Sequence, residues 1–158
     1  MSIDVLLIDD NLGDVRLTKE AIRDACSSVR LTVARDGAEA MAFLRHIYAP
    51  RPGLILLDLN LPKTSGLEVL ALIKSDASLQ TIPTVILTSS HAEADVEKSY
   101  KLGANCYLRK PKEWDTFAHR VKTVFDFWLT KAKLPSPRTK APDEFRSSGS
   151  PVTPLTGD

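Results

Sequence analysis

Four short apolar runs in this chain each end in polar side chains that could do chemistry. The runs at residues 5–8, 54–57, 85–87 and 106–108 are followed by Asp9 and Asp10, by Asp58, by Thr88, and by Arg109 and Lys110. A single Asp after an apolar run is usually only a turn residue. Ligands of open α/β sheets, however, bind beyond the carboxyl ends of the strands. If these runs are parallel strands, their polar groups meet at one edge of the sheet, and we expect a shared site there.

The chemistry that these groups suggest is the transfer of a phosphoryl group. Carboxylates that converge on one place repel one another unless a cation joins them. Oxygen ligands from two or three acids suit Mg²⁺, which also binds phosphate oxygens. A lysine at the same edge would bind a phosphoryl oxygen rather than a second metal ion. We therefore expect Asp58 to be the nucleophile, with Mg²⁺ and Lys110 neutralising charge.

The elements that must position this site alternate between strands and helices. Gly53 precedes the run at 54–57 and Pro62 follows it, which is typical of a short strand buried on both faces. Residues 31–34 predict a further strand. Helices are predicted at about 11–26, 38–46 and 66–75, after residue 95 as far as Gly103, and from Trp114 onward. Five strands alternating with five helices indicate an α/β fold, with one parallel sheet, helices on both of its faces and right-handed crossovers.

The last helix carries one continuous apolar stripe, spaced three, four, four and three residues apart: Trp114, Phe117, Val121, Phe125 and Trp128. We expect this stripe to belong to the core. Phe127 and Leu134 fall outside it, and exposed large apolar residues can mark a contact surface. They predict a homodimer through the last two helices and strand five.

Composition excludes several classes of function. The 158 residues suit one domain. Lys and Arg number 21 against 20 Asp and Glu, so the chain lacks the positive charge that binding to nucleic acid needs. No apolar run reaches the length of a membrane span, and the N-terminus has no signal pattern. We expect a cytoplasmic protein without nucleic-acid or membrane partners.

The remaining residue types add little chemistry. Cys26 and Cys106 have no metal-ligand spacing and are predicted to be buried free thiols. The three histidines are at no spacing that suggests a metal site or a phosphohistidine relay. Five of the ten prolines lie from Pro135 onward. We therefore expect a domain at 1–134 and a Pro/Ser/Thr-rich flexible tail at 135–158.

The order of the polar motifs is specific. They are Asp9-Asp10, Asp58-Leu-Asn60 with Pro62 and Gly66, Thr88-Ser89, and Lys110-Pro111. This set resembles the receiver domain of two-component response regulators over about residues 3–130. Residues 85–90, 95–100, 102–107 and 126–128 are similar to the single-domain regulators paired with bacterial phytochrome histidine kinases. The resemblance implies a doubly wound, flavodoxin-like receiver fold with strand order 2-1-3-4-5.

The same resemblance implies a role for each polar residue. Asp58 would accept a phosphoryl group from a kinase phosphohistidine, and Lys110 and Thr88 would contact that group. Mg²⁺ would be held by the side chains of Asp10 and Asp58, by the backbone carbonyl of Asn60, and by Asp9 through water. Thr88 and Tyr107 would form a switch, in which Tyr107 swings inward as Thr88 moves. The output would be a population shift on the surface of the last two helices and strand five.

Other functions fit the residues less well. An aspartate-based phosphatase normally has a second carboxylate two residues after the nucleophile, and Asn60 cannot release a proton. A dinucleotide site would need a Gly-rich turn, which residues 8–14 lack. We therefore expect a phospho-acceptor signalling protein, not an enzyme, that assists its own phosphorylation and dephosphorylation. The alternatives are a phosphate sink or relay, or an interaction module that works without phosphorylation.

Overall fold

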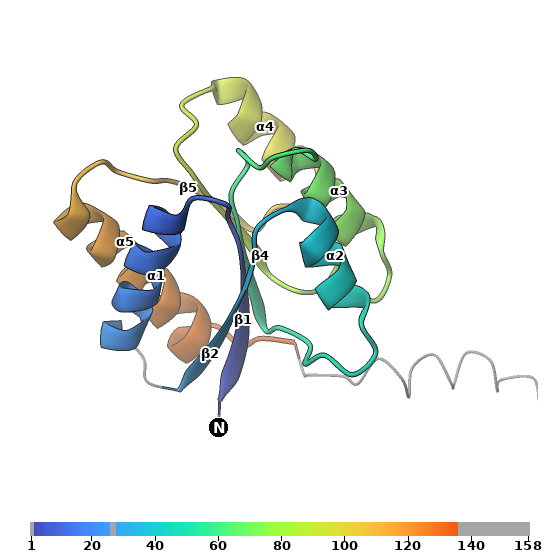
Figure 1. The fold of residues 1–158 in the computed structure, drawn as a ribbon, viewed down its shortest axis with the longest axis horizontal. Helices are drawn as coiled ribbons and strands as arrows, with labels where there is room; N and C mark the ends of the chain where they lie inside the picture. Colours follow the sequence, from blue (N-terminus) through green and yellow to red (C-terminus); the bar gives the residue numbers. More distant parts are fainter. Residues whose placement is uncertain (1, 26–27, 136–158) are drawn as a thin grey trace, which may run out of the picture.

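Strands and helices alternate along the chain in the computed structural model, which describes residues 2–25 and 28–135 (Figure 1). The strands are β1 (Ile3–Ile8), β2 (Val29–Ala34), β3 (Leu54–Leu57), β4 (Thr84–Thr88) and β5 (Cys106–Arg109). The helices are α1 (Leu12–Ala25), α2 (Gly37–Arg45), α3 (Gly66–Ser75), α4 (Glu93–Lys101) and α5 (Trp114–Asp126), and a π-helical turn follows at Phe127–Lys131. Cys26 and the predicted tail from residue 136 onward lie outside the described residues.

The strands form one parallel sheet in the order β2-β1-β3-β4-β5. This confirms the predicted α/β fold and strand order. Strand β3 lies in the middle, and Leu54–Leu57 are buried at every position. The neighbouring strands β1 and β4 place their carboxyl ends beside that of β3, because all the pairings are parallel. The polar residues that follow these strands are therefore brought to the same edge of the sheet.

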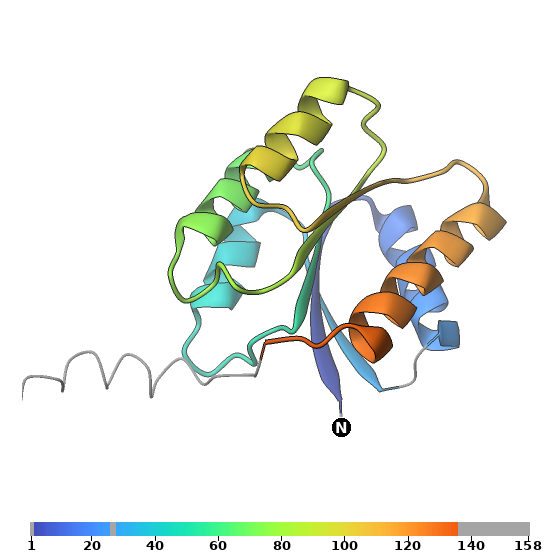
Figure 2. The same ribbon diagram turned by 180° about the vertical axis from the view of Figure 1, so that it is seen from behind.

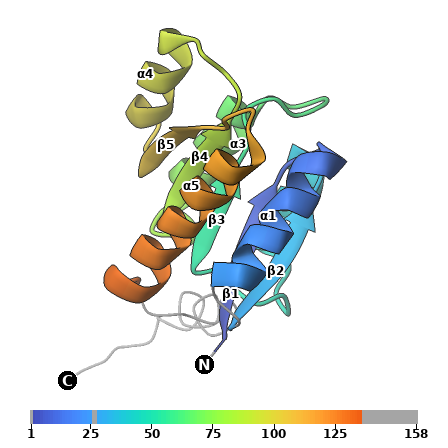
Figure 3. The same ribbon diagram turned by 90° about the vertical axis from the view of Figure 1, so that its left-hand side faces the viewer.

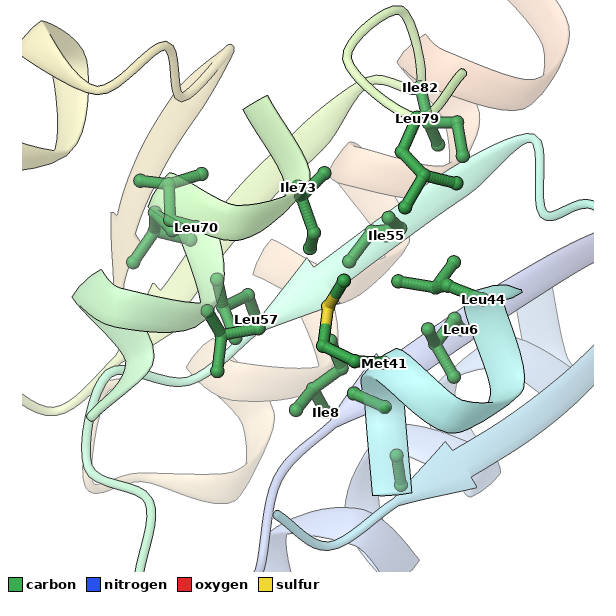
Figure 4. Close-up of a cluster of buried hydrophobic side chains, with 14 of the residues drawn as sticks. Leu6, Ile8, Met41, Leu44, Ile55, Leu57, Leu70, Ile73, Leu79 and Ile82 are labelled. Atoms are coloured by element: carbon green, nitrogen blue, oxygen red, sulfur yellow. The ribbon is translucent and has the colours of Figure 1, made fainter. Parts of the chain in front are cut away.

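Helices cover both faces of the sheet, with α1 and α5 side by side on one face and α2, α3 and α4 on the other (Figures 2 and 3). Alternate residues of β1 divide between the two layers, as the pleat of a strand requires. Val5 and Leu7 pack with α1 and α5, whereas Leu6 and Ile8 pack on the other side. There they meet Met41 and other side chains of α2 and α3 in a continuous apolar cluster (Figure 4).

The last helix corrects one prediction. Phe117, Val121 and Phe125 are buried as expected, but the Trp114 residue is 39% exposed and Trp128 is only partly buried. Trp114 is the first residue of α5, and this end of the helix begins away from the strands (Figure 1). Its ring stacks on that of Phe117. The core stripe is therefore shorter than the sequence pattern predicts.

The residues after α5 run past the start of β3. Phe127 is 52% exposed, as its position outside the stripe predicts, and its ring forms a T-shaped pair with that of Trp128. Leu134 is partly buried and approaches Gly53, which precedes β3, so it is less exposed than Phe127.

Two further predictions concern cysteine and membranes. Cys106 is a free thiol, but it is half-buried rather than buried, and this burial raises the pKa of the thiol. None of the helices within 2–25 and 28–135 has the length and apolar character of a membrane span.

Candidate functional site

The edge formed by the carboxyl ends of β1, β3 and β4 gathers the polar residues. The backbone N–H of Asp58 donates to the carbonyl of Ile8 at 2.9 Å, which extends the β1–β3 pairing by one residue and sets Asp58 beside Asp9. The N–H of Lys110 donates to the carbonyl of Thr88 at 2.7 Å, so the chain beyond β5 stays close to the end of β4. The four side chains that were predicted at separate strand ends, those of Asp9, Asp58, Thr88 and Lys110, therefore lie in one site.

Lys110 lies at the centre of this site. Its ammonium Nζ donates to Asp9 Oδ2 at 2.7 Å, to Asp58 Oδ2 at 2.8 Å and to Asp14 Oδ2 at 2.9 Å. The Lys110 side chain is 5% exposed, and those of Asp9 and Asp58 are 1% and 6% exposed. Buried charges of this kind persist only when they are paired and hydrogen-bonded. The lysine therefore holds acidic groups from two strand ends and from α1 together.

Burial and charge have opposite effects on this lysine. Burial alone would lower the pKa of Lys110, but the carboxylates of Asp9 and Asp58 outweigh burial and raise that pKa above its ordinary value. Burial raises the pKa of Asp9 to about 6, although Lys110 acts in the opposite direction. At neutral pH both groups are ionised. Three carboxylates around one ammonium then leave an excess of negative charge.

The second carboxylate oxygen of Asp58 accepts hydrogen bonds from groups other than Lys110. Its Oδ1 accepts from the Thr88 hydroxyl at 2.8 Å and from the backbone N–H of Asn60 at 3.0 Å. Thr88 is fully buried. Hydrogen bonds to an ionised acceptor are among the stronger ones in proteins. The Asp58 carboxylate is therefore fixed in orientation at both oxygens.

Gly66 allows the loop after β3 to close over Asp58. A Cβ at this position would lie 2.4 Å from the carbonyl oxygen of Asp58 and 2.4 Å from the Cα of Leu59. No side chain fits there, so only glycine permits this approach. Helix α3 then begins at Gly66, and its first turn is capped by Ser65, whose hydroxyl accepts from the N–H of Glu68.

The residues predicted to bind metal supply only oxygen atoms. Asp10 is exposed directly after the buried Asp9, and Asn60 is exposed after Asp58. No group of three or more His, Cys, Asp or Glu residues in the described part of the chain is arranged to hold a metal ion. The predicted set has two carboxylate side chains and one main-chain carbonyl, which is the sparse oxygen ligation that Mg²⁺ accepts with water and phosphate. The residues and their excess negative charge therefore fit a divalent cation.

Tyr107 belongs to a second group of contacts next to Thr88. Its side chain is partly buried, and burial is the main reason why its pKa is raised. Its hydroxyl donates to the carbonyl of Ser90 at 3.5 Å, and the N–H of Ser90 donates to Thr88 Oγ1 at 3.4 Å. Thr88 and Tyr107 therefore meet the same short segment after β4.

Sequence reasoning missed one member of the site. Asp14 lies within the helix predicted at about 11–26 and was given no chemical role, because it does not follow a strand. It lies in the first turn of α1, five residues after Asp9, and this turn begins at the same edge of the sheet. That proximity is the signal that could have identified it. Hydrogen bonds join Asp9, Asp58, Thr88 and Lys110 directly, whereas the Asp10 side chain makes none within the described part of the chain.

Known proteins share this fold and sequence. The response regulator receiver domain family matches residues 5–122. Response regulator Rcp1 of Synechocystis is 45% identical over 136 residues, which cover 84% of this chain and 92% of Rcp1. A crystal structure of the phosphorylated cyanobacterial phytochrome response regulator RcpA is 44% identical, with a TM-score of 0.83, and covers 86% of this chain and 100% of RcpA.

One further structure and one further relative extend the comparison. The Mn²⁺-bound form of Rcp1 has a TM-score of 0.80 and 45% identity, covering 85% of this chain and 99% of Rcp1. The probable methanogenesis regulatory protein FilR2 of Methanothrix harundinacea is 35% identical and covers 84% of this chain and 88% of FilR2. Together with the strand order and the family match, these similarities show that the chain belongs to the response regulator receiver domain family of two-component signalling and is related to the phytochrome response regulators.

Proposed function

We propose that this chain accepts a phosphoryl group on Asp58 from the phosphohistidine of a histidine kinase, in a reaction that depends on Mg²⁺. The observation that carries this proposal is the double fixation of the Asp58 carboxylate. Lys110 holds Oδ2, while Thr88 and the Asn60 N–H hold Oδ1. An oriented nucleophile beside a buried cation is what transfer of a phosphoryl group requires.

The reaction is a displacement at phosphorus. An Asp58 carboxylate oxygen attacks the phosphoryl group, and a new O–P bond forms as the P–N bond to the kinase imidazole breaks. The electron pair of that bond leaves with the imidazole nitrogen, which takes a proton from solvent. Lys110 and Thr88 then donate hydrogen bonds to phosphoryl oxygens, where negative charge is concentrated. The product is an acyl phosphate on Asp58.

The divalent cation would be held by the side chains of Asp10 and Asp58, by the carbonyl of Asn60, and by Asp9 through water. A bound Mg²⁺ supplies neutralisation of the negative charge on the transferred group. The excess of carboxylates around Lys110 supports this assignment, since it leaves negative charge that one lysine does not balance. The Mn²⁺-bound form of the related Rcp1 supports a divalent ion in this family.

The kinase partner is proposed to be of the phytochrome type. Support comes from the relatives, because RcpA is a cyanobacterial phytochrome response regulator and is similar to this chain over most of both chains. The protein acts in the cytoplasm as a phospho-acceptor that assists its own phosphorylation and dephosphorylation, rather than as an enzyme with a separate substrate.

Thr88 and Tyr107 form the switch in this proposal. Phosphorylation draws the Thr88 hydroxyl from Asp58 toward a phosphoryl oxygen, and the Ser89–Ser90 segment follows because Ser90 N–H is bonded to Thr88. Tyr107 is bonded to the carbonyl of the same Ser90, so its ring moves with that segment. The change reaches the surface of α4, β5 and α5.

The altered surface favours a homodimer through the last two helices and strand five. Tyr100 on α4 and Trp114 on α5 are both exposed, with 50% and 39% of their surfaces accessible, and Phe127 lies just beyond α5. Sedimentation tests this part of the proposal. A monomer at micromolar concentration, both with and without a phosphoryl analogue, would remove it.

Intact mass after incubation with Mg²⁺ and acetyl phosphate tests the main proposal. The wild type gains one phosphoryl group, and Asp58→Asn gains none. Omission of Mg²⁺ prevents the gain on the wild type. Absence of an adduct on a folded wild type, with acetyl phosphate and with a phytochrome-type kinase, would instead favour an interaction module that works without phosphorylation.

A further inference from the structure

Asp14 is the third acceptor of the Lys110 ammonium. An ammonium group has three N–H donors. In Lys110 these are matched by one oxygen each of Asp9, Asp58 and Asp14, at 2.7, 2.8 and 2.9 Å. A phosphoryl group on Asp58 brings new oxygen acceptors to the same lysine. When Lys110 contacts that group, the phosphoryl oxygens and the present acceptors compete for the same three N–H donors.

Burial decides which hydrogen bond is lost. The Asp9 side chain is 1% exposed, so loss of its lysine would leave a buried carboxylate without its main partner. The Asp58 contact passes to a phosphoryl oxygen on the same side chain, so a second phosphoryl contact must displace Asp9 or Asp14. The Asp14 side chain is 30% exposed, and water can replace Lys110 as its hydrogen-bond donor. The Asp14 contact is thus the one that is exchanged at least cost.

The position of Asp14 is fixed by its own backbone. Its N–H donates to Asn11 Oδ1 at 2.9 Å, and its carbonyl accepts from the buried Thr18 hydroxyl at 2.7 Å. The N–H of Asn11 in turn donates to Asp9 Oδ1 at 2.9 Å. These hydrogen bonds connect the first turn of α1 to Asp9 on one side and to Thr18 on the other. The backbone of Asp14 is therefore fixed where its carboxylate can reach Lys110.

We propose that Asp14 is a positioning residue that holds Lys110 in the unphosphorylated state and competes with the phosphoryl group for this lysine. The inference rests on the proposed phosphorylation of Asp58. Asp14 acts through Lys110 and touches no reacting atom. The negative charge of Asp14 slows phosphorylation for two reasons. It occupies an N–H of Lys110 that the phosphoryl group needs, and it repels the anionic molecule that donates the phosphoryl group.

The variant Asp14→Asn removes the charge and keeps the shape of the side chain. Its rate of phosphorylation by acetyl phosphate should rise about threefold to fivefold, the effect expected of a partly exposed ion pair. The matched control is Asp24→Asn, which removes an exposed carboxylate from the same helix away from the site and should leave the rate unchanged. Each variant is measured at Mg²⁺ saturation determined for that variant, and thermal unfolding checks that it is folded.

Ionic strength separates a charge effect from a structural one. The gain in Asp14→Asn should shrink between about 0.02 M and about 0.5 M salt, because solvent ions screen a partly exposed carboxylate. A change of packing would not depend on salt in this way. If Asp14→Asn unfolds, Asp14→Ser, which is also neutral and suited to the start of a helix, replaces it.

The outcomes distinguish the two proposals. A faster rate in Asp14→Asn that depends on salt, with Asp24→Asn equal to the wild type, supports the role of Asp14. A rate that is unchanged or slower, on a wild type that is phosphorylated at Asp58, overturns this role and leaves the proposed function intact. A wild type that gains no phosphoryl group overturns both.

Discussion

Two lysines at opposite edges of the sheet each make three hydrogen bonds, but to different kinds of acceptor. Lys110, after β5, donates to the carboxylates of Asp9, Asp14 and Asp58. Lys74, in the last turn of α3, donates to the carbonyls of Gln80 and Ile82 at 2.9 Å and to Asn105 Oδ1 at 3.1 Å. Burial lowers the pKa of Lys74, whereas the carboxylates overcome burial and raise the pKa of Lys110.

The acceptors decide what each lysine can do. Neutral oxygens satisfy the donors of Lys74 and leave no net negative charge, so this edge is a structural clamp between α3 and the segments that lead into β4 and β5. Gly103, with φ +107°, leaves room for the Lys74 stem, since a Cβ there would lie 3.1 Å from Lys74 Cγ. The carboxylates around Lys110 exceed its charge, so this edge can attract a cation and a phosphoryl donor.

The largest effect is expected from Lys110→Met. It leaves Asp9 and Asp58 buried beside each other without the lysine, which should lower the free energy of unfolding by about 4 kcal/mol. Urea unfolding in EDTA measures this loss. The variant should also fail to accept a phosphoryl group at Asp58. A loss no greater than that of Lys74→Met would mean that the two lysines do not differ as described.

A smaller effect is expected from the titration of Asp9. Because its pKa is raised from 3.8 to about 6, the native state binds a proton more readily than the unfolded chain does. The stabilising contribution of this proton is complete below about pH 3.8 and is lost as the pH rises to about 6.

Asp9→Asn lacks this titration. The unfolding free energy of the wild type should therefore fall relative to that of Asp9→Asn between pH 3.5 and 7, by about 3 kcal/mol at 1.36 kcal/mol per pKa unit. Unfolding in EDTA across this range measures it, with Lys74→Met as a control that should keep the wild-type pH dependence. A constant difference between wild type and Asp9→Asn would contradict the raised pKa.

The smallest effect is expected from Lys74→Met. Loss of its charged donor leaves three acceptors that water can partly reach, which should cost about 2 kcal/mol of unfolding free energy. Phosphorylation by acetyl phosphate should keep the wild-type rate, because Lys74 is at the opposite edge of the sheet from Asp58. A phosphorylation defect in a folded Lys74→Met would show that the two edges are coupled.

The sequence was sufficient to predict the fold and most of the site around Lys110. Short apolar runs separated by helical periodicity predict a parallel sheet, and the strand-end rule then brings Asp9, Asp58, Thr88 and Lys110 to one edge. Asp14 was missed because no strand-end rule applies to a helix turn. Lys74 was missed as a clamp because its acceptors are mainly backbone carbonyls, which leave no pattern of residue types.

Trp114 shows a different limit of sequence patterns. Helical periodicity states which residues share a face, but not how far the sheet extends beneath that face. The first turn of α5 starts away from the strands, so a residue of the apolar stripe remains partly exposed. The π-helical turn at Phe127–Lys131 likewise has no marker among its residue types.

The measurement that tests the central claim most directly is chemical trapping of the acyl phosphate. Borohydride reduces an aspartyl phosphate to homoserine, and peptide mass mapping then identifies the position. After incubation with Mg²⁺ and acetyl phosphate, we predict homoserine at position 58 and unchanged aspartate at Asp9, Asp10 and Asp14. Conversion at any of those three residues, or an adduct that borohydride does not convert, would contradict the assignment of Asp58 as the phosphoacceptor.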